Sequence, residues 1–480
     1  MEIDLLYFKK IIKGMPNTKD ILKRKIVLNN FEPLKDSSGK DRKLLRLIFI
    51  SGALSVLFLA IIIFTLPYTD LSLSSLFVFS SIVSLVIFLF VLLFRYFSIL
   101  VMAYLYITRY TVQQKNTYTP FVSIIVPVYN EGKVLTESIK SLLKLNYSNY
   151  EIIIVNDGST DNTKQVAQSL VGLQDGLNSK VRISLVNKAN GGKSRALNAG
   201  IQVSKGDFVL CMDGDSQLSP DTLKYGVSHF IDPAIGAVAG NVKVLNRKKF
   251  LTDLQSLEYL EGLNMPRSAQ SFLKLVNIIP GPIGIFRKKA IQDAGWYASD
   301  TFAEDADLTL KILAAGWKIY YEPMAISWTE APDKLNQLLK QRYRWTRGII
   351  QSIRKHKKHL MNPTINFNNS LVLWSMFYES LIWPIMNIFA NGYFIIVALF
   401  FGMSNLLVFW WAGLALLDLM TSLYCIAVEK EEVRLIPYAI VYRLFFILLI
   451  DITKFMATIE EFLGMQMTWG KLERIGTAKA

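Results

Sequence analysis

The chain has 480 residues, of which 52% are hydrophobic and 19% are charged. This combination excludes an ordinary soluble protein, which is less apolar, and a chain buried entirely in lipid, which carries fewer charges. The formal net charge of +15 suits a phosphorylated ligand, anionic lipid or nucleic acid, and the apolar stretches beside the basic runs favour lipid over nucleic acid.

The chain begins with a basic segment that is followed by two apolar stretches. Residues 45–66 and 76–106 each reach the roughly 20 residues that a helix needs to cross a bilayer. A turn at 67–70 separates them, so they are predicted to form a helical hairpin. The basic residues of 9–46 are expected to stay in the cytoplasm, and the hairpin then returns the chain to the cytoplasm near Arg109.

Strand and helix patterns alternate between about residues 114 and 366. The predicted strands are 122–126, 152–155, 182–186 and 208–212, and the predicted helices are 133–145, 162–170 and 192–203. Strands that are continuous apolar runs between helices indicate a parallel sheet covered on both faces. In such sheets ligands bind beyond the carboxyl ends of the strands, so functional residues are expected there.

The last third of the chain is apolar again, with candidate spans at 371–401, 406–427 and 435–450. An odd number of spans would place the basic tail outside, against the positive-inside rule. The first candidate is long enough to contain an interfacial helix broken at Pro384. Charged residues near the end of the third candidate leave its nature open.

Carboxylates lie at the ends of three predicted strands. Glu131 and Asp157 each occupy a strand–turn–helix junction, where ordinary helix capping is the alternative interpretation. Asp213 and Asp215 follow the fourth strand, and this pattern presents two carboxylates to one point, as a hard divalent cation carrying a diphosphate requires. Lys193 begins a helix after two glycines and could contact a phosphate, although the full phosphate-loop pattern is absent.

Two further groups of residues lie downstream. Glu304 and Asp305 are the first of three carboxylates within four residues, and clustered carboxylates raise one another's pKa, which suits a general base. A solvated helix start is the alternative. Gln341, Arg344 and Trp345 share one helical face, where Arg can clamp a diphosphate and an indole can pack on a sugar ring. An amphipathic helix on the membrane surface is compatible with the same pattern.

Taken in chain order, five motifs resemble the processive family 2 glycosyltransferases, which include cellulose, chitin, hyaluronan and poly-N-acetylglucosamine synthases. The motifs are 127–131, 156–161, 213–215, 303–305 and 341–345. The ordered set is specific, whereas each motif alone is not. The resemblance covers about residues 121–358 together with the flanking spans. Within the family, bacterial poly-β-1,6-N-acetylglucosamine synthases are the most similar at 286–288, 328–332 and 341–348.

The resemblance implies an α/β GT-A glycosyltransferase domain, with a mostly parallel sheet, inserted between α-helical transmembrane segments. The expected parts are a basic cytoplasmic leader (1–44), an N-terminal transmembrane hairpin (45–106), a cytoplasmic GT-A catalytic domain (114–332), an amphipathic interface helix with the QxxRW motif (333–366), C-terminal transmembrane helices (371–463) and a basic tail (464–480). The protein is accordingly expected to be a multi-pass protein of the cell membrane.

The resemblance also implies roles for single residues. The nucleotide sugar would be bound by Tyr129, Glu131, Asp157, Lys193, Asp213 and Arg344. Mg²⁺ or Mn²⁺ would be held by Asp213 and Asp215. The general base would be Asp305, beside Glu304, and the acceptor would be bound by Gly281, Pro282, Gln341 and Trp345. The chain departs from the family pattern at Ala303, which leaves the base intact, and at Asn156, which removes one carboxylate near the donor base.

The implied activity is that of a UDP-sugar-dependent hexosyltransferase, with inverting and processive transfer of a sugar to a growing β-linked polysaccharide that crosses the membrane. The resemblance favours UDP-N-acetylglucosamine as the donor. The implied partners are the UDP-sugar, the polysaccharide acceptor and the lipid bilayer, with room for a small membrane partner subunit and no role for nucleic acid. A hyaluronan-, chitin- or glucan-type synthase, an enzyme that adds one sugar to a lipid phosphate, and a catalytically silent scaffold stay open as alternatives.

Overall fold

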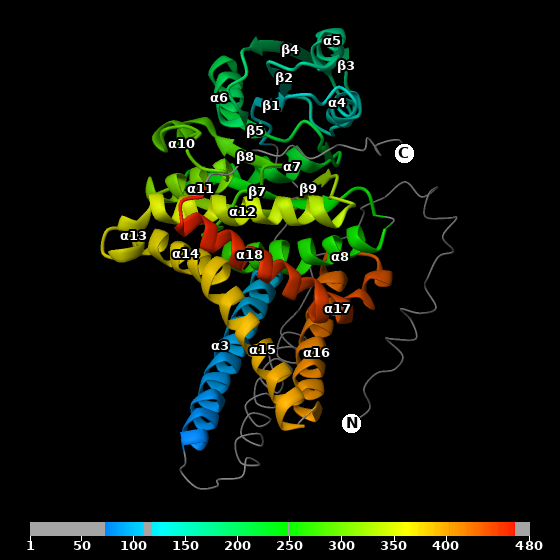
Figure 1. Cartoon of the computed structure of the whole chain (residues 1–480). Helices are drawn as coiled ribbons and strands as arrows, with labels where there is room; N and C mark the ends of the chain where they lie inside the picture. The colour runs from blue at the N-terminus through cyan, green and yellow to red at the C-terminus, as the bar shows by residue number, and fades with distance from the viewer. Residues whose placement is uncertain (1–72, 110–117, 248, 403, 466–480) are drawn as a thin grey trace. The chain divides into compact units, whose positions relative to one another are not determined.

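The computed structural model describes residues 73–109, 118–247, 249–402 and 404–465 (Figure 1). All of them belong to the unit Leu47–Ala480. The predicted basic leader, the first predicted span at 45–66 and the basic tail beyond residue 465 lie outside the described residues.

A single mixed sheet contains the nine strands found in the described part of the chain, in the order β3-β4-β2-β1-β5-β8-β7-β9-β6. The strands are β1 (Val122–Val128), β2 (Tyr150–Asp157), β3 (Gly172–Asp175), β4 (Lys180–Lys188), β5 (Phe208–Cys211), β6 (Gln217–Leu218), β7 (Ile235–Val244), β8 (Gly284–Arg287) and β9 (Lys318–Thr329). The four predicted strands correspond to β1, β2, β4 and β5, which are parallel neighbours, so the predicted fold class is confirmed.

The other half of the sheet was not predicted as strands. β8 pairs antiparallel with both β5 and β7, and β6 pairs antiparallel with β9. β7 is buried along its whole length although it contains Gly240, Asn241 and Lys243. The last two side chains bond Glu429 and Glu431, which are almost 190 residues away in sequence. These distant partners make burial of the polar residues possible, and the local sequence gives no sign of them.

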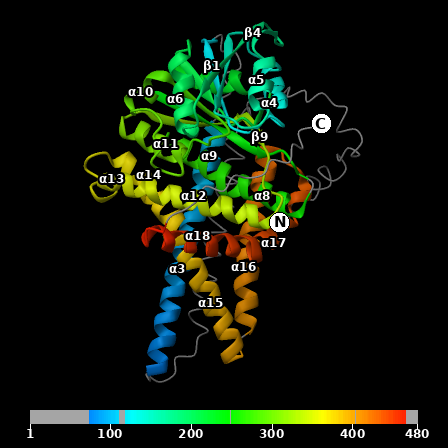
Figure 2. The ribbon, with the colours of Figure 1, turned by 45° about the horizontal axis from the view of Figure 1, so that its top comes forward.

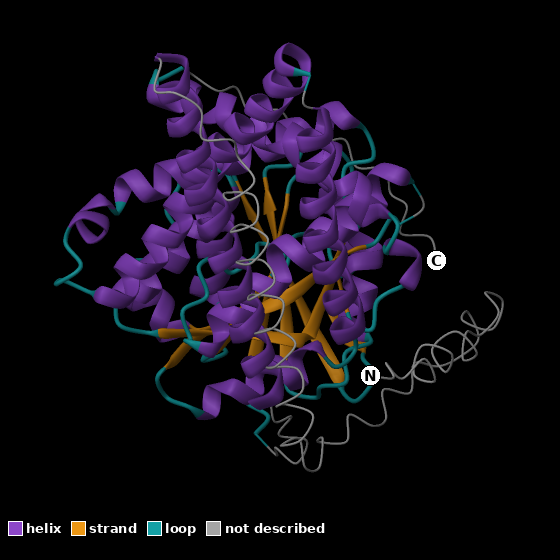
Figure 3. Ribbon diagram, turned by 90° about the horizontal axis from the view of Figure 1, so that it is seen from below, coloured by secondary structure: helices purple, strands orange, loops and turns teal. Residues whose placement is uncertain are grey.

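Helices cover both faces of the sheet, as its continuous apolar strands require (Figure 3). On β1, Ile124 and Val126 contribute to one core and Ile125 to the other. The first core also includes side chains of α4 (Leu135–Leu143), α5 (Thr163–Ser169) and α7 (Thr222–Ser228). The second core includes side chains of α6 (Lys193–Val203), α10 (Lys288–Asp293) and α11 (Glu304–Ala314). The helices α6 and α11 therefore lie on the same face of the sheet.

Four segments of the described chain are long and apolar enough to cross a membrane: Val86–Thr108, Phe367–Phe400, Leu407–Glu429 and Val433–Phe462. The elements that form them are α3 (Leu73–Arg109), α14 (Phe367–Phe377), η3 (Tyr378–Ile382), α15 (Trp383–Phe401), α16 (Ser404–Glu429), η4 (Val433–Leu435), α17 (Tyr438–Val441), η5 (Tyr442–Phe446) and α18 (Ile447–Phe462). The break expected near Pro384 is the π-helical turn η3, after which Pro384 lies in the first turn of α15, where a missing N–H costs little.

The amphipathic segment after the sheet forms α12 (Leu335–Lys355), which lies beside α18 in both ribbon views (Figures 1 and 2). A buried ion pair joins the two helices, with Arg347 Nε 2.7 Å from Glu461 Oε2. In the same views α18 runs across the direction of α3, α15 and α16. The last candidate span is therefore fastened to the helix that follows the sheet.

The close contact between α6 and the sheet generates a stability prediction. An ideal Cβ at Gly200 would lie 2.5 Å from Ile125 Cγ2 and 2.9 Å from Val155 Cγ2, and both neighbours are fully buried. Gly200→Ala should therefore cost about 1–3 kcal/mol of stability by overpacking. Gln202→Ala, at an exposed position of the same helix, should cost less than about 0.5 kcal/mol.

Thermal unfolding in detergent, followed with a thiol-reactive dye, measures this difference, because both cysteines of the chain are buried and free. Equal unfolding temperatures for the two variants would show that α6 can move away from the sheet without cost.

Candidate active site

The loops that follow β1 and β2 are tied together by side-chain hydrogen bonds. Asn130, which has a φ of 55°, accepts a bond from the backbone N–H of Thr160 at 2.7 Å. The backbone N–H of Glu131 donates to Thr163 Oγ1 at 2.8 Å. Neither α4 nor α5 has a side-chain hydrogen bond at its N-cap residue, so these polar residues join one loop to the other and the capping interpretation is not confirmed.

Asp157, at the end of β2, holds the loop that leads to Lys193. Its carboxylate accepts hydrogen bonds from the backbone N–H groups of Gly191 (3.0 Å) and Gly192 (2.8 Å), and it forms an ion pair with Lys188. Its side chain is almost fully buried. That Asp157 also contacts a nucleotide, as the resemblance implies, stays a prediction, but Asp157 directly holds the loop before Lys193.

The ends of β1 and β5 meet at Gly214. An ideal Cβ on this glycine would lie 2.2 Å from Glu131 Oε2, so a larger residue would displace Glu131. The two residues beside Gly214 differ in exposure. The side chain of Asp213 is 25% exposed, whereas Asp215 is buried. Glu131 follows β1 and Asp213 follows β5, and both are predicted to bind the donor. Both residues therefore lie at the carboxyl edge of the sheet.

Lys193, the first residue of α6, bridges two carboxylates from different parts of the chain. Its Nζ lies 2.5 Å from Asp213 Oδ1 and 3.0 Å from Glu304 Oε1. Burial alone would lower the pKa of Lys193, but Asp213 and Glu304 outweigh burial and raise the pKa above its ordinary value. Lys193 is therefore protonated at neutral pH and connects the end of β5 to the start of α11.

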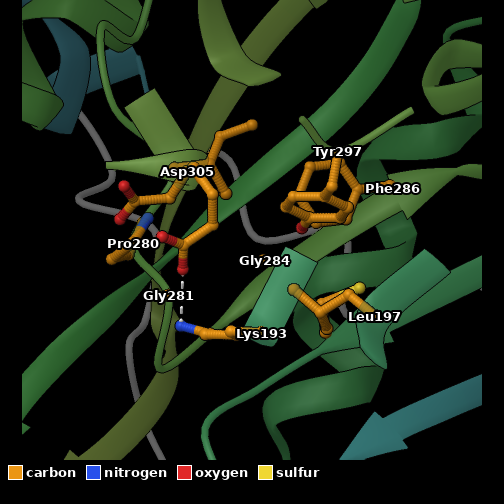
Figure 4. Close-up of a pocket in the computed structure, with 11 residues that line it drawn as sticks. Lys193, Leu197, Pro280, Gly281, Gly284, Phe286, Tyr297 and Asp305 are labelled. Carbon is orange, nitrogen blue, oxygen red and sulfur yellow. Dashed lines mark ion pairs between the residues drawn. The ribbon is translucent and has the colours of Figure 1, made fainter. Parts of the chain in front are cut away.

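A pocket with an empty volume of about 240 Å³ opens around this bridge. Its lining residues are Lys193, Leu197, Cys211, Ile279, Pro280, Gly281, Gly284, Phe286, Tyr297, Glu304 and Asp305 (Figure 4). Gly281 has a steric reason to be glycine, since an ideal Cβ there would lie 2.8 Å from Lys193 Nζ and 3.4 Å from Asp213 Oδ2. The loop predicted to bind the acceptor thus lies against the donor-side charges.

The candidate base, Asp305, has a pKa suited to proton transfer. Burial, and then the negative charge of Glu304, raises the pKa of Asp305 to about 6, and Lys193 opposes this shift. The backbone of Asp305 is also held in place. Its carbonyl oxygen accepts a hydrogen bond from Thr309 Oγ1 at 2.6 Å, and Thr309 Oγ1 in turn accepts one from the backbone N–H of Ile279 at 3.0 Å. A carboxylate with a pKa near 6 can lose and regain a proton close to neutral pH.

The third carboxylate of this cluster, Asp307, does not line the pocket. It is fully buried and forms ion pairs with Lys355 (3.0 Å) and His356 (3.0 Å) at the end of α12. Burial would raise the pKa of Asp307, but hydrogen bonds from His356 and Lys355 lower it below the ordinary value. Asp307 therefore fastens α11 to α12.

None of the three predicted residues of α12 belongs to the lining of the pocket. Arg344 Nη1 donates to the carbonyl of Phe302 at 3.3 Å, and its charge acts on Asp305, whose pKa it lowers. Gln341 accepts a hydrogen bond from Arg342, whose guanidinium also stacks on the ring of Trp345. The structure brings Arg344 close to the base, whereas Gln341 and Trp345 are engaged with Arg342.

Asp213 and Asp215 offer the hard oxygen ligands that Mg²⁺ or Mn²⁺ prefers. Among the described residues, no group of three or more His, Cys, Asp or Glu side chains converges as a metal site would require. Two carboxylates nevertheless fit an ion that takes its remaining ligands from water and phosphate oxygens, which is the usual manner of binding Mg²⁺. The ammonium of Lys193 beside Asp213 shows that this edge accepts positive charge.

Several residues of the site carry no signal in the sequence. Phe286 and Tyr297 form an apolar wall of the pocket with ring centroids 6.4 Å apart, and of the two only Phe286 lies in one of the segments that carry the resemblance. Glu258 and Arg342 form a buried ion pair beside Trp345. A tertiary contact between residues 84 positions apart can be read only from the structure.

Comparison with known proteins gives consistent results. Residues 123–295 match the family model "Glycosyl transferase family 2". The poly-beta-1,6-N-acetyl-D-glucosamine synthases of Staphylococcus aureus (strain COL) and Staphylococcus epidermidis are 34% and 33% identical to this chain over 228 and 229 residues. Each alignment covers 47% of this chain and 54% of the relative, so the chain spans about half the length of the curated relatives it matches.

A solved structure shares the fold. The mannosyltransferase PcManGT from Pyrobaculum calidifontis, in complex with GDP-Man and Mn²⁺, superposes with a TM-score of 0.52 at 18% sequence identity. The superposition covers 77% of this chain and 96% of that protein. At this identity the likeness concerns the fold alone.

The role of Asp157 generates a prediction about the loop before α6. Asp157→Ala removes the hydrogen bonds from the N–H groups of Gly191 and Gly192 and the ion pair with Lys188, at a cost of about 1 kcal/mol per hydrogen bond. Hydrogen–deuterium exchange should therefore be roughly 10-fold faster or more in peptides spanning 188–193.

Asp175→Ala, at an exposed position of β3, is the matched control and should leave that exchange unchanged. If Asp157→Ala exchanged like the wild type, the carboxylate would not be what holds the loop.

Proposed function

We propose that the protein, whose residues 123–295 match the model of the family 2 glycosyltransferases, transfers a sugar from a UDP-sugar to a growing β-linked polysaccharide, with inversion at the anomeric carbon. The observation that carries this proposal is the bridge of Lys193 between Asp213 and Glu304. The bridge joins the edge of the sheet that would hold a cation and a diphosphate to the start of α11, which carries Asp305. The pKa of Asp305, about 6, suits a general base.

The chain's own residues account for the reaction as follows. Asp305 takes the proton from the acceptor hydroxyl, and the hydroxyl oxygen forms a bond to the anomeric carbon of the donor. The bond from that carbon to the diphosphate oxygen breaks, and its electron pair leaves with UDP. Lys193 neutralises part of the charge that develops on the diphosphate, and Arg344 can add a second positive charge. A single displacement of this kind converts an α-linked donor sugar into a β-linkage.

A divalent cation, Mg²⁺ or Mn²⁺, belongs to the proposal. Asp213 and Asp215 would hold it, and when bound it would act as a Lewis acid that stabilises the leaving diphosphate. The donor base would lie near Tyr129, Glu131 and Asp157, at the ends of β1 and β2. Gly281, Pro282, Gln341 and Trp345 would face the acceptor.

The proposed donor is UDP-N-acetylglucosamine and the proposed product a poly-β-1,6-N-acetylglucosamine. The names of the two staphylococcal relatives support this choice, together with the motifs that the chain shares with that group. Four candidate membrane helices among the described residues support a membrane protein. A multi-pass arrangement in the cell membrane, with the sheet domain in the cytoplasm, is part of the proposal. Processive synthesis with export of the chain between these helices completes the proposal, and a small partner subunit is compatible with it.

The direct test is UDP release by purified, detergent-solubilised protein with Mg²⁺ or Mn²⁺. UDP-N-acetylglucosamine, UDP-glucose and UDP-glucuronate would be offered singly and in pairs, and products would be sized on a gel. Long polymer from UDP-N-acetylglucosamine alone supports the proposal. A single added sugar would favour transfer to a lipid phosphate, and UDP binding without turnover of any donor would favour a silent scaffold.

The raised pKa of Asp305 predicts the pH dependence of the reaction. The base must be ionised, so kcat/KM should rise with pH up to about 6 and level off above it. Asp305→Asn should lower kcat by about 10²- to 10⁴-fold above pH 6, where the base of the wild type is ionised, while UDP still binds.

Glu304→Gln sharpens the test, because removing a neighbouring negative charge should shift the acid limb to lower pH. A limb that stays in place in Glu304→Gln, or full activity in Asp305→Asn, would show that another group is the base. Titration calorimetry with UDP separates loss of chemistry from loss of binding.

A further inference from the structure

Arg342 contacts two of the proposed acceptor residues at once, although it occupies one of the unspecified positions of the QxxRW motif. Its Nη1 donates to Gln341 Oε1 at 2.5 Å. Its Cζ lies 4.3 Å from the centroid of the Trp345 ring, which is cation–π distance. One guanidinium therefore contacts both the amide and the indole.

The guanidinium is itself held from another helix. Glu258, the last residue of α8 (Phe250–Glu258), receives hydrogen bonds from Arg342 Nε at 2.9 Å and Nη2 at 2.5 Å. Arg342 is only 3% exposed, so this pair is shielded from water and salt. Leu254 and Leu257 of α8 share an apolar cluster with Leu338 of α12, which fixes the two helices against each other.

The contacts of Arg342 restrict the rotamers of Gln341 and Trp345, which the geometry of α12 alone does not fix. Gln341 and Arg342 are adjacent, and adjacent residues on a helix do not face each other, so the bond between them draws the Gln341 amide toward the Arg342 side. Trp345 lies three residues after Arg342 on the same face, where the planar guanidinium covers its ring. Loss of Arg342 would free both side chains to change rotamer.

We propose that Arg342 is a positioning residue for the acceptor: Glu258 fixes its guanidinium, and the guanidinium fixes Gln341 and Trp345 against the acceptor sugar. The inference rests on the proposed function, which supplies the acceptor. It assigns α8 a part in acceptor binding, although no residue of α8 lines the pocket around Lys193.

The test uses Arg342→Lys in the full-length protein. A lysine keeps the charge but has no planar fork, so it cannot bond Glu258, bond Gln341 and cover the indole together. The KM for β-1,6-linked N-acetylglucosamine oligomers should rise about 10-fold or more, which corresponds to about 1.4 kcal/mol. The KM for UDP-N-acetylglucosamine should change by less than about twofold, because Arg342 contacts no proposed donor residue. Product chains should also become shorter.

Two more variants separate positioning from a general structural role. Glu258→Gln keeps an acceptor atom and removes the charge, and it should show the same split between the two KM values. Arg347→Lys is the matched control on the same helix, because Arg347 is also buried in an ion pair, with Glu461, and contacts neither Gln341 nor Trp345 in the structure. It should leave the KM for the oligomers unchanged.

The outcomes are distinguishable. If the wild type polymerises and both Arg342→Lys and Glu258→Gln keep the wild-type KM for oligomers, the inference alone is overturned. Equal rises in both KM values, matched by Arg347→Lys and by a lower unfolding temperature, would show a structural role and overturn it as well. If the wild type releases UDP from no donor, the proposed function fails first and the inference fails with it.

Discussion

The ammonium group of Lys193 is shared by two carboxylates, Asp213 and Glu304. The three residues belong to the start of α6, the end of β5 and the start of α11, so the bridge joins elements far apart in the sequence. Two partly buried carboxylates so close to each other would repel without a cation between them. The positive charge therefore allows the donor edge and the base-bearing helix to occupy one site.

The rest of the sheet domain can be understood as support for this bridge. Asp157 accepts bonds from the loop that ends at Lys193, and Gly200 lets α6 approach the sheet. Glycine at position 281 leaves room for the ammonium group. Thr309 links the backbone of Asp305 to the loop before β8. Each contact limits the movement of a charged group, which is what electrostatic stabilisation of a transition state requires.

The helix α12 connects this site to the helices that could cross the membrane. It is fastened at three places: Arg342 pairs with Glu258 of α8, Arg347 with Glu461 of α18, and His356 with Asp307 of α11. Because these contacts join α12 to both helices, a movement of α11, which carries the candidate base, or of α18, which belongs to the last candidate span, would displace α12. This gives a physical route by which synthesis in the pocket and passage of a polymer could be coupled.

The parallel half of the fold could be predicted from the sequence because β1, β2, β4 and β5 each contain a short apolar run and helices alternate with them. β7 could not, since Asn241 and Lys243 are buried only through distant partners. The motifs located Lys193, Asp213, Glu304 and Asp305, which the structure brings together. They could not reveal that Asp307 turns away to α12, or that Arg342 lies between Gln341 and Trp345, because those contacts depend on how helices pack.

The most direct test of the central claim, that one base and one diphosphate site act on opposite sides of the same anomeric carbon, is the stereochemistry of the product. The purified protein would be supplied with UDP-N-acetylglucosamine labelled with ¹³C at the anomeric carbon, and the polymer would be studied by NMR. The account predicts only β-linked anomeric signals from the α-linked donor. Signals of α-linkages would contradict it, because they would require two displacements and a nucleophile that the site was not inferred to provide.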